Sequence, residues 1–157
     1  MDKIRTIEGD LNARDMRVTI VAARFNEFIV ESLLKGAVHC LCQHGATDSA
    51  IEIIRVPGAY EMPLAVDKVA AARRADGIIA LGAVIRGSTP HFDYVSGECM
   101  RGVAASARQH GVPVGMGVLT TDTIEQAIER AGTKAGNKGE EAALAMIEML
   151  NLLRQLD

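Results

Sequence analysis

The 157-residue chain has no tryptophan, and its only aromatic residues are three Phe and two Tyr, so the positions of these rings are informative. No apolar run approaches the roughly 20 residues of a membrane span, and we expect no membrane partner. The net charge of −3 and the lack of a Lys/Arg block argue against nucleic acid. Three cysteines, an odd number, and no secretory apolar segment favour a reduced, cytoplasmic setting.

The chain also lacks internal repeats, low-complexity tracts and linkers, so we expect one domain over residues 1–157. Residues 1–16 are polar and mixed; residues 4–8 favour a short strand, but nothing adjacent in sequence would pair with it. The other expected strands are residues 18–23, 50–56, 77–84 and 112–119. The expected helices are residues 27–43, 59–74, 90–109, 122–131 and 138–156. Four strand–helix repeats predict a parallel sheet covered on both faces, a three-layer α/β domain.

Residues 82–94 form the segment with the clearest chemical signal. Gly82 and Gly87 belong to a loop that ends at Ser88 and Thr89, where we expect a helix to begin. Pro90 suits the first position of that helix. Free N–H groups and the positive dipole end make such a helix start an anion site, above all for phosphate. The dipole also favours the neutral, proton-accepting form of His91, although a surface histidine without a role is the alternative. The segment favours chemistry on a phosphorylated small molecule.

Aromatic rings follow three of the expected strands, where ligands of open α/β sheets bind. Phe25 follows the first strand, Tyr60 the second, and Phe92 and Tyr94 the third, whereas Phe28 lies in a helix. A ring at a strand end is often a lid on the core; the alternative is stacking on a flat heterocycle. The polar neighbours of Phe25 favour stacking for that residue.

The loop of residues 56–61 is a second candidate contact with a ligand. Pro57 and Gly58 fix a turn that a ligand can approach closely, and the following helix begins with free N–H groups. Glu61 suits either the helix dipole or a polar ligand contact, and these alternatives stay open. A hydroxyl-rich substituent would match this carboxylate and these backbone groups.

Four basic residues, Arg86, Arg130, Lys134 and Lys138, are candidate partners of an anion. For Arg130 the alternative is an interaction with the C-terminal end of its own helix. Residues 133–139 suit either a phosphate-binding loop or an ordinary connection between helices.

Residues 39–44 resemble a metal site, but within a helix they spread around the axis, and we expect no metal there. The glycines of residues 82–87 match neither a dinucleotide-binding fingerprint nor a Walker A loop.

These motifs together resemble the lumazine synthase family, from about residue 18 to residue 152. The resemblance depends on residues 24–26, 56–61, 82–94 and 117–139, which are weak singly and specific in this order and spacing. It implies an enzyme of riboflavin biosynthesis that works without cofactor or metal. The implied reaction condenses 5-amino-6-ribitylaminouracil with 3,4-dihydroxy-2-butanone 4-phosphate, forming 6,7-dimethyl-8-ribityllumazine and releasing phosphate.

The resemblance also implies a role for each residue that matches a motif. His91 would be the general base and acid. The pyrimidine and its ribityl chain would contact Phe25, Asn26, Ala59, Tyr60, Glu61, Val84, Ile85, Met116 and Lys138. The phosphate would be held by Gly87, Ser88, Thr89 and Arg130.

A flavodoxin-like fold in a homopentamer is the implied architecture, with each site between neighbouring subunits. Residues 1–16 would then contact a neighbour, adding their strand to its sheet. A larger assembly of pentamers and riboflavin synthase are further candidate partners. Met116 stands where many relatives have a bulkier group that reaches into the neighbour's pocket. The thioether of Met116 can still cover a ring, so we expect altered affinity for the substrate rather than its loss.

Two other classes of protein stay open. One is a non-catalytic module that binds a flavin or a phosphorylated ligand in the same pocket. The other is a structural assembly that has lost turnover, against which the motif residues Phe25, Glu61, His91 and Arg130 argue. Formation of the fluorescent lumazine from both substrates would distinguish the enzyme from the binding module.

Overall fold

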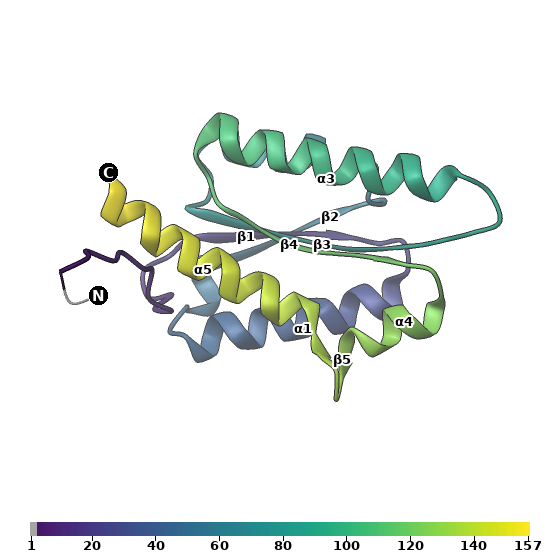
Figure 1. Cartoon of the computed structure of the whole chain (residues 1–157), viewed down its shortest axis with the longest axis horizontal. Coiled ribbons are helices and arrows are strands. Elements are labelled where there is room, and N and C mark those ends of the chain that lie inside the picture. Colours follow the sequence, from purple (N-terminus) through teal and green to yellow (C-terminus); the bar gives the residue numbers. More distant parts are fainter. Residues whose placement is uncertain (1–2) are drawn as a thin grey trace.

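Four parallel strands form the centre of the fold, and helices cover both of its faces (Figure 1). The computed structural model describes residues 3–157. The strands are β1 (Val18–Ala23), β2 (Ile51–Val56), β3 (Gly77–Ile85), β4 (Val114–Thr121), β5 (Ala131–Thr133) and β6 (Gly136–Asn137). The helices are α1 (Glu27–Gln43), α2 (Met62–Ala71), α3 (His91–His110), α4 (Ile124–Glu129), α5 (Lys138–Leu156) and the short 3-10 helix η1 (Asp48–Ala50).

The central sheet has the strand order β2-β1-β3-β4, and all neighbouring strands run parallel. Helices α2 and α3 cover one face, while α1 and α5 cover the other (Figure 1). The chain first moves outward from β1 to β2 and then returns to β3 and β4, so the order reverses between β1 and β3. This arrangement confirms the predicted flavodoxin-like, three-layer α/β fold. Ligands of such sheets bind outside the carboxyl ends of the strands at the reversal point.

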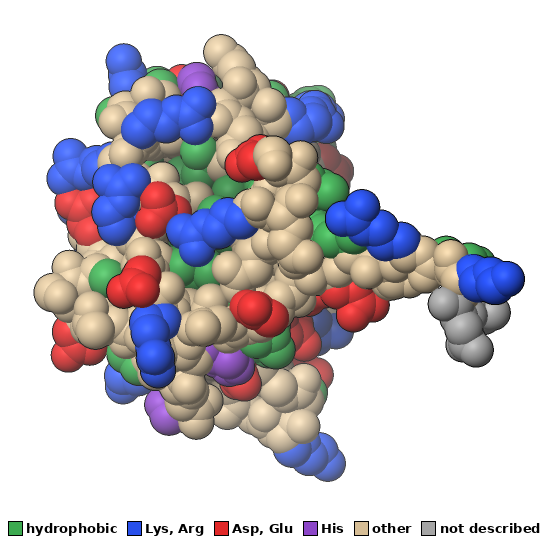
Figure 2. Space-filling model, turned by 90° about the vertical axis from the view of Figure 1, so that its left-hand side faces the viewer, with side chains coloured by type: hydrophobic (Ala, Val, Ile, Leu, Met, Phe, Trp, Pro, Cys, Tyr) green, Lys and Arg blue, Asp and Glu red, His purple; other side chains and the backbone are tan. Residues whose placement is uncertain are grey.

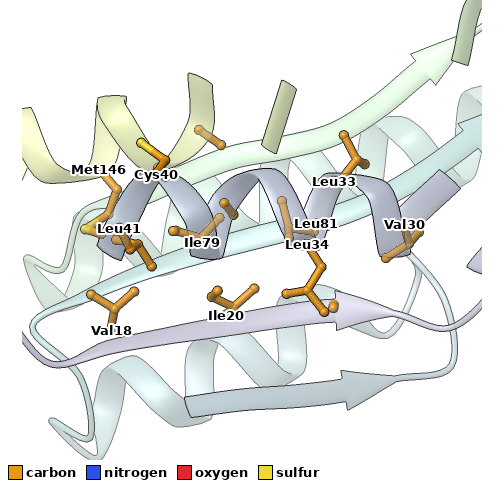
Figure 3. Packing of buried hydrophobic residues seen from close by; sticks show 14 of the residues in the cluster. Val18, Ile20, Val30, Leu33, Leu34, Cys40, Leu41, Ile79, Leu81 and Met146 are labelled. Atoms are coloured by element: carbon orange, nitrogen blue, oxygen red, sulfur yellow. The ribbon is translucent and has the colours of Figure 1, made fainter. Parts of the chain in front are cut away.

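Two apolar cores, one on each face of the sheet, hold the layers together. Successive strand residues point to opposite faces, so Ile20 packs toward α1 and α5, whereas Val21 packs toward α2 and α3. In the first core, Leu33 and Leu41 of α1 and Met146 of α5 lie over β1 and β3 (Figure 3). Both faces of β1 and β3 are therefore buried, as their apolar runs predict. No helix within residues 3–157 is both long and apolar enough to cross a membrane.

Most predicted element ends are correct within one residue, but those of α2, β4 and α4 are not. Helix α2 begins at Met62 rather than at residue 59, because Pro63 has no N–H and fits only in the first helical turn. It also ends at Ala71, three residues early. Strand β4 begins after Pro113 and extends to Thr121, which pairs with the end of β3. Because β2 ends at Val56 and α2 begins at Met62, residues 57–61 form an irregular connection whose backbone a ligand can approach.

The connection between α4 and α5 is a small β-hairpin, where the sequence predicted only a break between helices. Helix α4 ends at Glu129, two residues before the predicted end. Strands β5 and β6 pair antiparallel. Gly132 in β5 and Gly136 in β6 have φ angles of +119° and +100°, a backbone conformation that glycine adopts more readily than other residues.

Asn137 fixes the start of α5 at the predicted residue. Its Oδ1 accepts hydrogen bonds from the backbone N–H groups of Gly139 at 2.8 Å and Glu140 at 3.1 Å, which is an N-cap. Its Nδ2 donates to the carbonyl of Ser32 in α1 at 3.0 Å. The Asn137 side chain thus caps α5 and joins it to α1. It thereby fixes the position of Lys138, the first residue of α5.

The N-terminal segment contacts α5 and then extends from the body as an arm (Figure 2). Asn151 of α5 donates to the carbonyls of Asp10 and Asn12, both at 2.9 Å. Residues 4–8 form no strand within the single chain, and their pairing with a neighbour's sheet stays a prediction. Residues 1 and 2 of the segment predicted to contact a neighbour lie outside the described residues.

Candidate active site

A cavity of about 630 Å³ lies outside the carboxyl ends of β1 and β3, where the strand order reverses. Its walls are the turn after β1, the connection from β2 to α2, the end of β3 and the start of α3. The predicted site residues that line it are Phe25, Asn26, Ala59, Tyr60, Glu61, Val84, Ile85, Gly87, Thr89 and His91. The fold therefore brings three of the predicted segments, residues 24–26, 56–61 and 82–94, around one space.

Phe25 and Asn26 form the first wall, in the turn between β1 and α1. Asn26 has φ 61° and ψ 44°, a left-handed conformation that Asn tolerates better than most residues. Its Nδ2 donates to the carbonyl of Ala83 in β3 at 2.9 Å, and the Phe25 N–H donates to the Pro57 carbonyl at 3.0 Å. Phe25 is 73% exposed, so its ring is not a lid on the core. The turn instead presents the ring to the cavity.

Replacing Asn26 with Gly should destabilise the fold less than replacing it with Ala. Glycine adopts the left-handed conformation freely, so Asn26→Gly loses mainly the hydrogen bond to Ala83, worth about 1 kcal/mol. Asn26→Ala adds the left-handed strain, about 1–2 kcal/mol. Denaturant unfolding at one protein concentration measures both losses. Equal destabilisation by the two substitutions would contradict the backbone explanation.

The connection between β2 and α2 forms the second wall. Ala59 is buried there, whereas Tyr60 is 66% exposed and lines the cavity. Glu61 is the N-cap residue of α2, but its side chain makes no capping hydrogen bond. Its Oε2 lies beside Gly58, 3.3 Å from where a Cβ on that residue would stand. The carboxylate thus lies at the cavity wall, where it can accept hydrogen bonds from ligand hydroxyl groups.

The start of α3 forms the third wall. His91 is the first residue of this 20-residue helix, and Pro90 is its N-cap, one position earlier than predicted. The first N–H groups of α3 have no partner within the helix, and the dipole favours an anion at this end. Gly87 and Thr89 line the cavity together with His91, but Ser88 does not. The imidazole therefore stands beside the part of the cavity best suited to a phosphate.

Arg86, predicted as a candidate partner of an anion, is occupied within the chain. Its Nε donates to Oδ1 of Asp122 at 2.9 Å, and an Nη atom lies 3.5 Å from Oδ1 of Asp93. Its guanidinium carbon lies 4.4 Å from the centroid of the Phe92 ring. The hydrogen bond to Asp122 raises the pKa of Arg86 above its ordinary value. With two carboxylates as partners, Arg86 is a poor candidate for holding a phosphate.

A second hollow, of about 540 Å³, lies at the edge strand β4 and contains Met116, Arg130 and Lys138. One Nη atom of Arg130 donates to the carbonyl of Gln126 at 3.0 Å, and Nζ of Lys138 lies 3.3 Å from Oε2 of Glu141. Sequence reasoning missed Glu141, although its i,i+3 spacing from Lys138 on a predicted helix was a usable signal. The three predicted residues do not reach the first cavity within one chain, because β4 is at the sheet edge.

The cysteine and histidine residues of α1 do spread around the helix axis. Cys40 is buried, and burial raises the pKa of its thiol to about 11. His39 and Cys42 are exposed, and the Cys42 thiol donates to Asp48 at 3.6 Å. Sγ of Cys40 does lie 3.7 Å from Nδ1 of His44, the residue that follows the helix by one position.

The fold and the cavity together define a class of protein. It is an α/β protein with flavodoxin-like strand order, whose cavity at the reversal point joins an exposed aromatic ring, a helix N-terminus and an imidazole. Over residues 15–154, nearly the whole chain, the sequence matches the family of 6,7-dimethyl-8-ribityllumazine synthase, and the chain belongs to this family. It is accordingly an enzyme of the lumazine synthase type, and its family implies riboflavin biosynthesis.

Proposed function

We propose that the chain condenses 5-amino-6-ribitylaminouracil with 3,4-dihydroxy-2-butanone 4-phosphate to form 6,7-dimethyl-8-ribityllumazine. The substrate amine attacks the ketone, and loss of water gives an imine. Removal of a proton then expels phosphate, and ring closure with loss of a second water gives the product. No step requires a nucleophile from the protein, so the orientation of two bound reactants supplies much of the acceleration.

The observation that carries this proposal is that Phe25, Glu61 and His91 line one cavity. The pyrimidine stacks on the exposed Phe25 ring. The hydroxyl groups of the ribityl chain bind to Glu61 and to the backbone around Ala59. His91 takes up and returns protons beside the phosphate-bearing substrate, which the loop of residues 87–89 contacts.

A phosphate in this cavity needs a cation that the cavity itself does not provide. Among the described residues that line the cavity, none is Lys or Arg. Arg130 is half exposed and uses one Nη atom within its chain, so it has donors free for a phosphate. We therefore propose that Arg130, Met116 and Lys138 of a neighbouring copy complete each site.

Exposed apolar side chains on the elements around the cavity support a homo-oligomer. Phe28, Leu64 and Tyr94 are 69–79% exposed, and exposed apolar surface of this kind marks interfaces. We propose a homopentamer, in which residues 4–8 add a strand to a neighbour's sheet. Assembly into a larger shell and association with riboflavin synthase stay predictions from the family resemblance.

The proposed function is tested by mixing the purified protein with both substrates. We expect phosphate release together with the absorbance and fluorescence of the lumazine, and a native mass of five chains or a multiple of five. Tight binding of a flavin or lumazine without turnover would instead identify a non-catalytic binding module and overturn the proposal.

Replacing Phe25 with Ala should weaken binding of the pyrimidine substrate about tenfold, because the stacking face is lost. The fold should stay within about 0.5 kcal/mol of wild type, because the ring is mostly exposed. Steady-state kinetics with the pyrimidine varied measures the effect. Phe28→Ala is the comparison variant for assembly, since it removes an exposed ring that lies outside the cavity and that we assign to the subunit interface. Equal losses in both variants would show that Phe25 acts through assembly rather than through stacking.

A further inference from the structure

Arg86 links three parts of the chain around the start of α3. It directly follows β3, and its backbone N–H donates to the carbonyl of Thr121 at 2.8 Å, where β3 and β4 separate. Its side chain contacts Phe92 and Asp93 in the first turn of α3 and Asp122 after β4. One guanidinium therefore joins the turn that carries the imidazole to the connection that follows β4.

The connection after β4 is a firm anchor for this contact. The Asp122 N–H donates to Oε1 of Gln126 at 2.8 Å, and the buried Thr121 donates through its hydroxyl to the Thr123 carbonyl at 2.9 Å. Thr123 and Gln126 also form a capping box at the start of α4. Asp122 is thus held in place by its neighbours. Because Arg86 contacts both Asp122 and the first turn of α3, it ties the start of α3 to this fixed position.

The loop of residues 86–90 has little else to hold it. All five residues are exposed, and a Cβ on Gly87 would meet no atom within 4 Å. None of the hydrogen bonds found within residues 3–157 engages the side chain of Ser88 or Thr89. The position of the loop therefore depends on its two ends, of which Arg86 is one.

We propose that Arg86 is a positioning residue: it holds the loop of residues 86–90 and the first turn of α3, and so determines where Thr89 and His91 stand in the cavity. This inference rests on the proposed function and deepens it. Arg86 acts through Asp122 and Phe92 and does not itself touch the phosphate. Surface ion pairs contribute little to stability, whereas a small misplacement of reacting groups lowers rates strongly.

The test compares Arg86→Gln, Asp122→Asn and the double variant in steady-state kinetics. We expect each single variant to lower kcat about tenfold, with a smaller change in KM for 3,4-dihydroxy-2-butanone 4-phosphate. The double variant should be no slower than Arg86→Gln, because both substitutions break the same contact. Arg101→Gln, which removes an exposed arginine paired with Glu98 of its own helix, is the control and should keep the wild-type kcat.

If Arg86 binds the phosphate directly, Arg86→Gln raises KM while kcat stays at the wild-type value, and Asp122→Asn leaves activity intact. That pattern overturns the inference.

Hydrogen exchange at residues 93–97 separates this outcome from failure of the proposed function. Positioning requires faster exchange there in Arg86→Gln and in Asp122→Asn, whether or not the wild type forms a lumazine. Unchanged exchange in both variants refutes it. Should Arg86→Gln fail to fold, Asp122→Asn keeps the arginine and decides the question alone.

Discussion

Replacing Arg130 with Ala is expected to lower kcat/KM of the proposed reaction about a hundredfold, the size of effect that follows loss of one strong charged donor. The described lining of the first cavity offers a phosphate no Lys or Arg, and in the proposed assembly the cation is Arg130 from the second hollow of a neighbour. The fold should tolerate the change, because the Arg130 side chain is half exposed; its Nη atom donates to the Gln126 carbonyl at 3.0 Å and lies 3.8 Å from Oε2 of Glu129. Initial rates of lumazine formation, with the phosphate-bearing substrate varied, measure the loss.

Lys134→Ala is the matched control for Arg130. It removes one positive charge from the exposed hairpin that follows Arg130, but Lys134 does not line the second hollow. We expect near-wild-type kinetics for this control. A similar loss in both variants would mean that only the general charge of the hairpin matters, and wild-type activity of Arg130→Ala would remove Arg130 from the site.

Replacing His91 with Ala is expected to lower kcat on the order of a hundredfold without abolishing turnover. The imidazole moves protons in the proposed reaction, but orientation of the two substrates stays intact in the variant. Binding of both substrates should therefore change little. Single-turnover rates with both substrates saturating separate the chemical step from binding.

His39→Ala is the control for His91, since His39 is exposed on α1 and lines neither hollow. Added imidazole should restore part of the rate in His91→Ala and none in a variant that has lost binding. Complete inactivity of His91→Ala with normal folding and substrate binding would contradict the view that orientation supplies much of the acceleration.

The sequence predicted the architecture well, because buried parallel strands are apolar along their length and helices have their own period. Strand β1 and helices α1 and α5 have the predicted ends. The start of α2 was wrong although Pro63 was a usable signal, since proline fits the first turn of a helix. The β5–β6 hairpin was beyond the sequence pattern, because its strands are too short to show a period.

In the candidate site, too, the sequence predicts what depends on strand order and does not predict what depends on contacts between distant side chains. Residues that directly follow β1, β2 and β3 gather at one edge of the sheet, so Phe25, Glu61 and His91 share a cavity as the topology requires. The hydrogen bond from Arg86 to Asp122 spans 36 positions of sequence and depends on side-chain geometry, which no local pattern encodes. The separation of Arg130 from the cavity likewise depends on β4 lying at the sheet edge.

The most direct test of the composite site is activity in mixed assemblies. Chains with Phe25→Ala and chains with Arg130→Ala are dissociated, mixed in equal amounts and reassembled. If each site takes its cavity from one chain and Arg130 from the next, random mixing leaves about a quarter of the sites with neither defect, and activity recovers to about that fraction. If each chain holds a complete site of its own, every site keeps one defect, and the mixture stays as slow as its components.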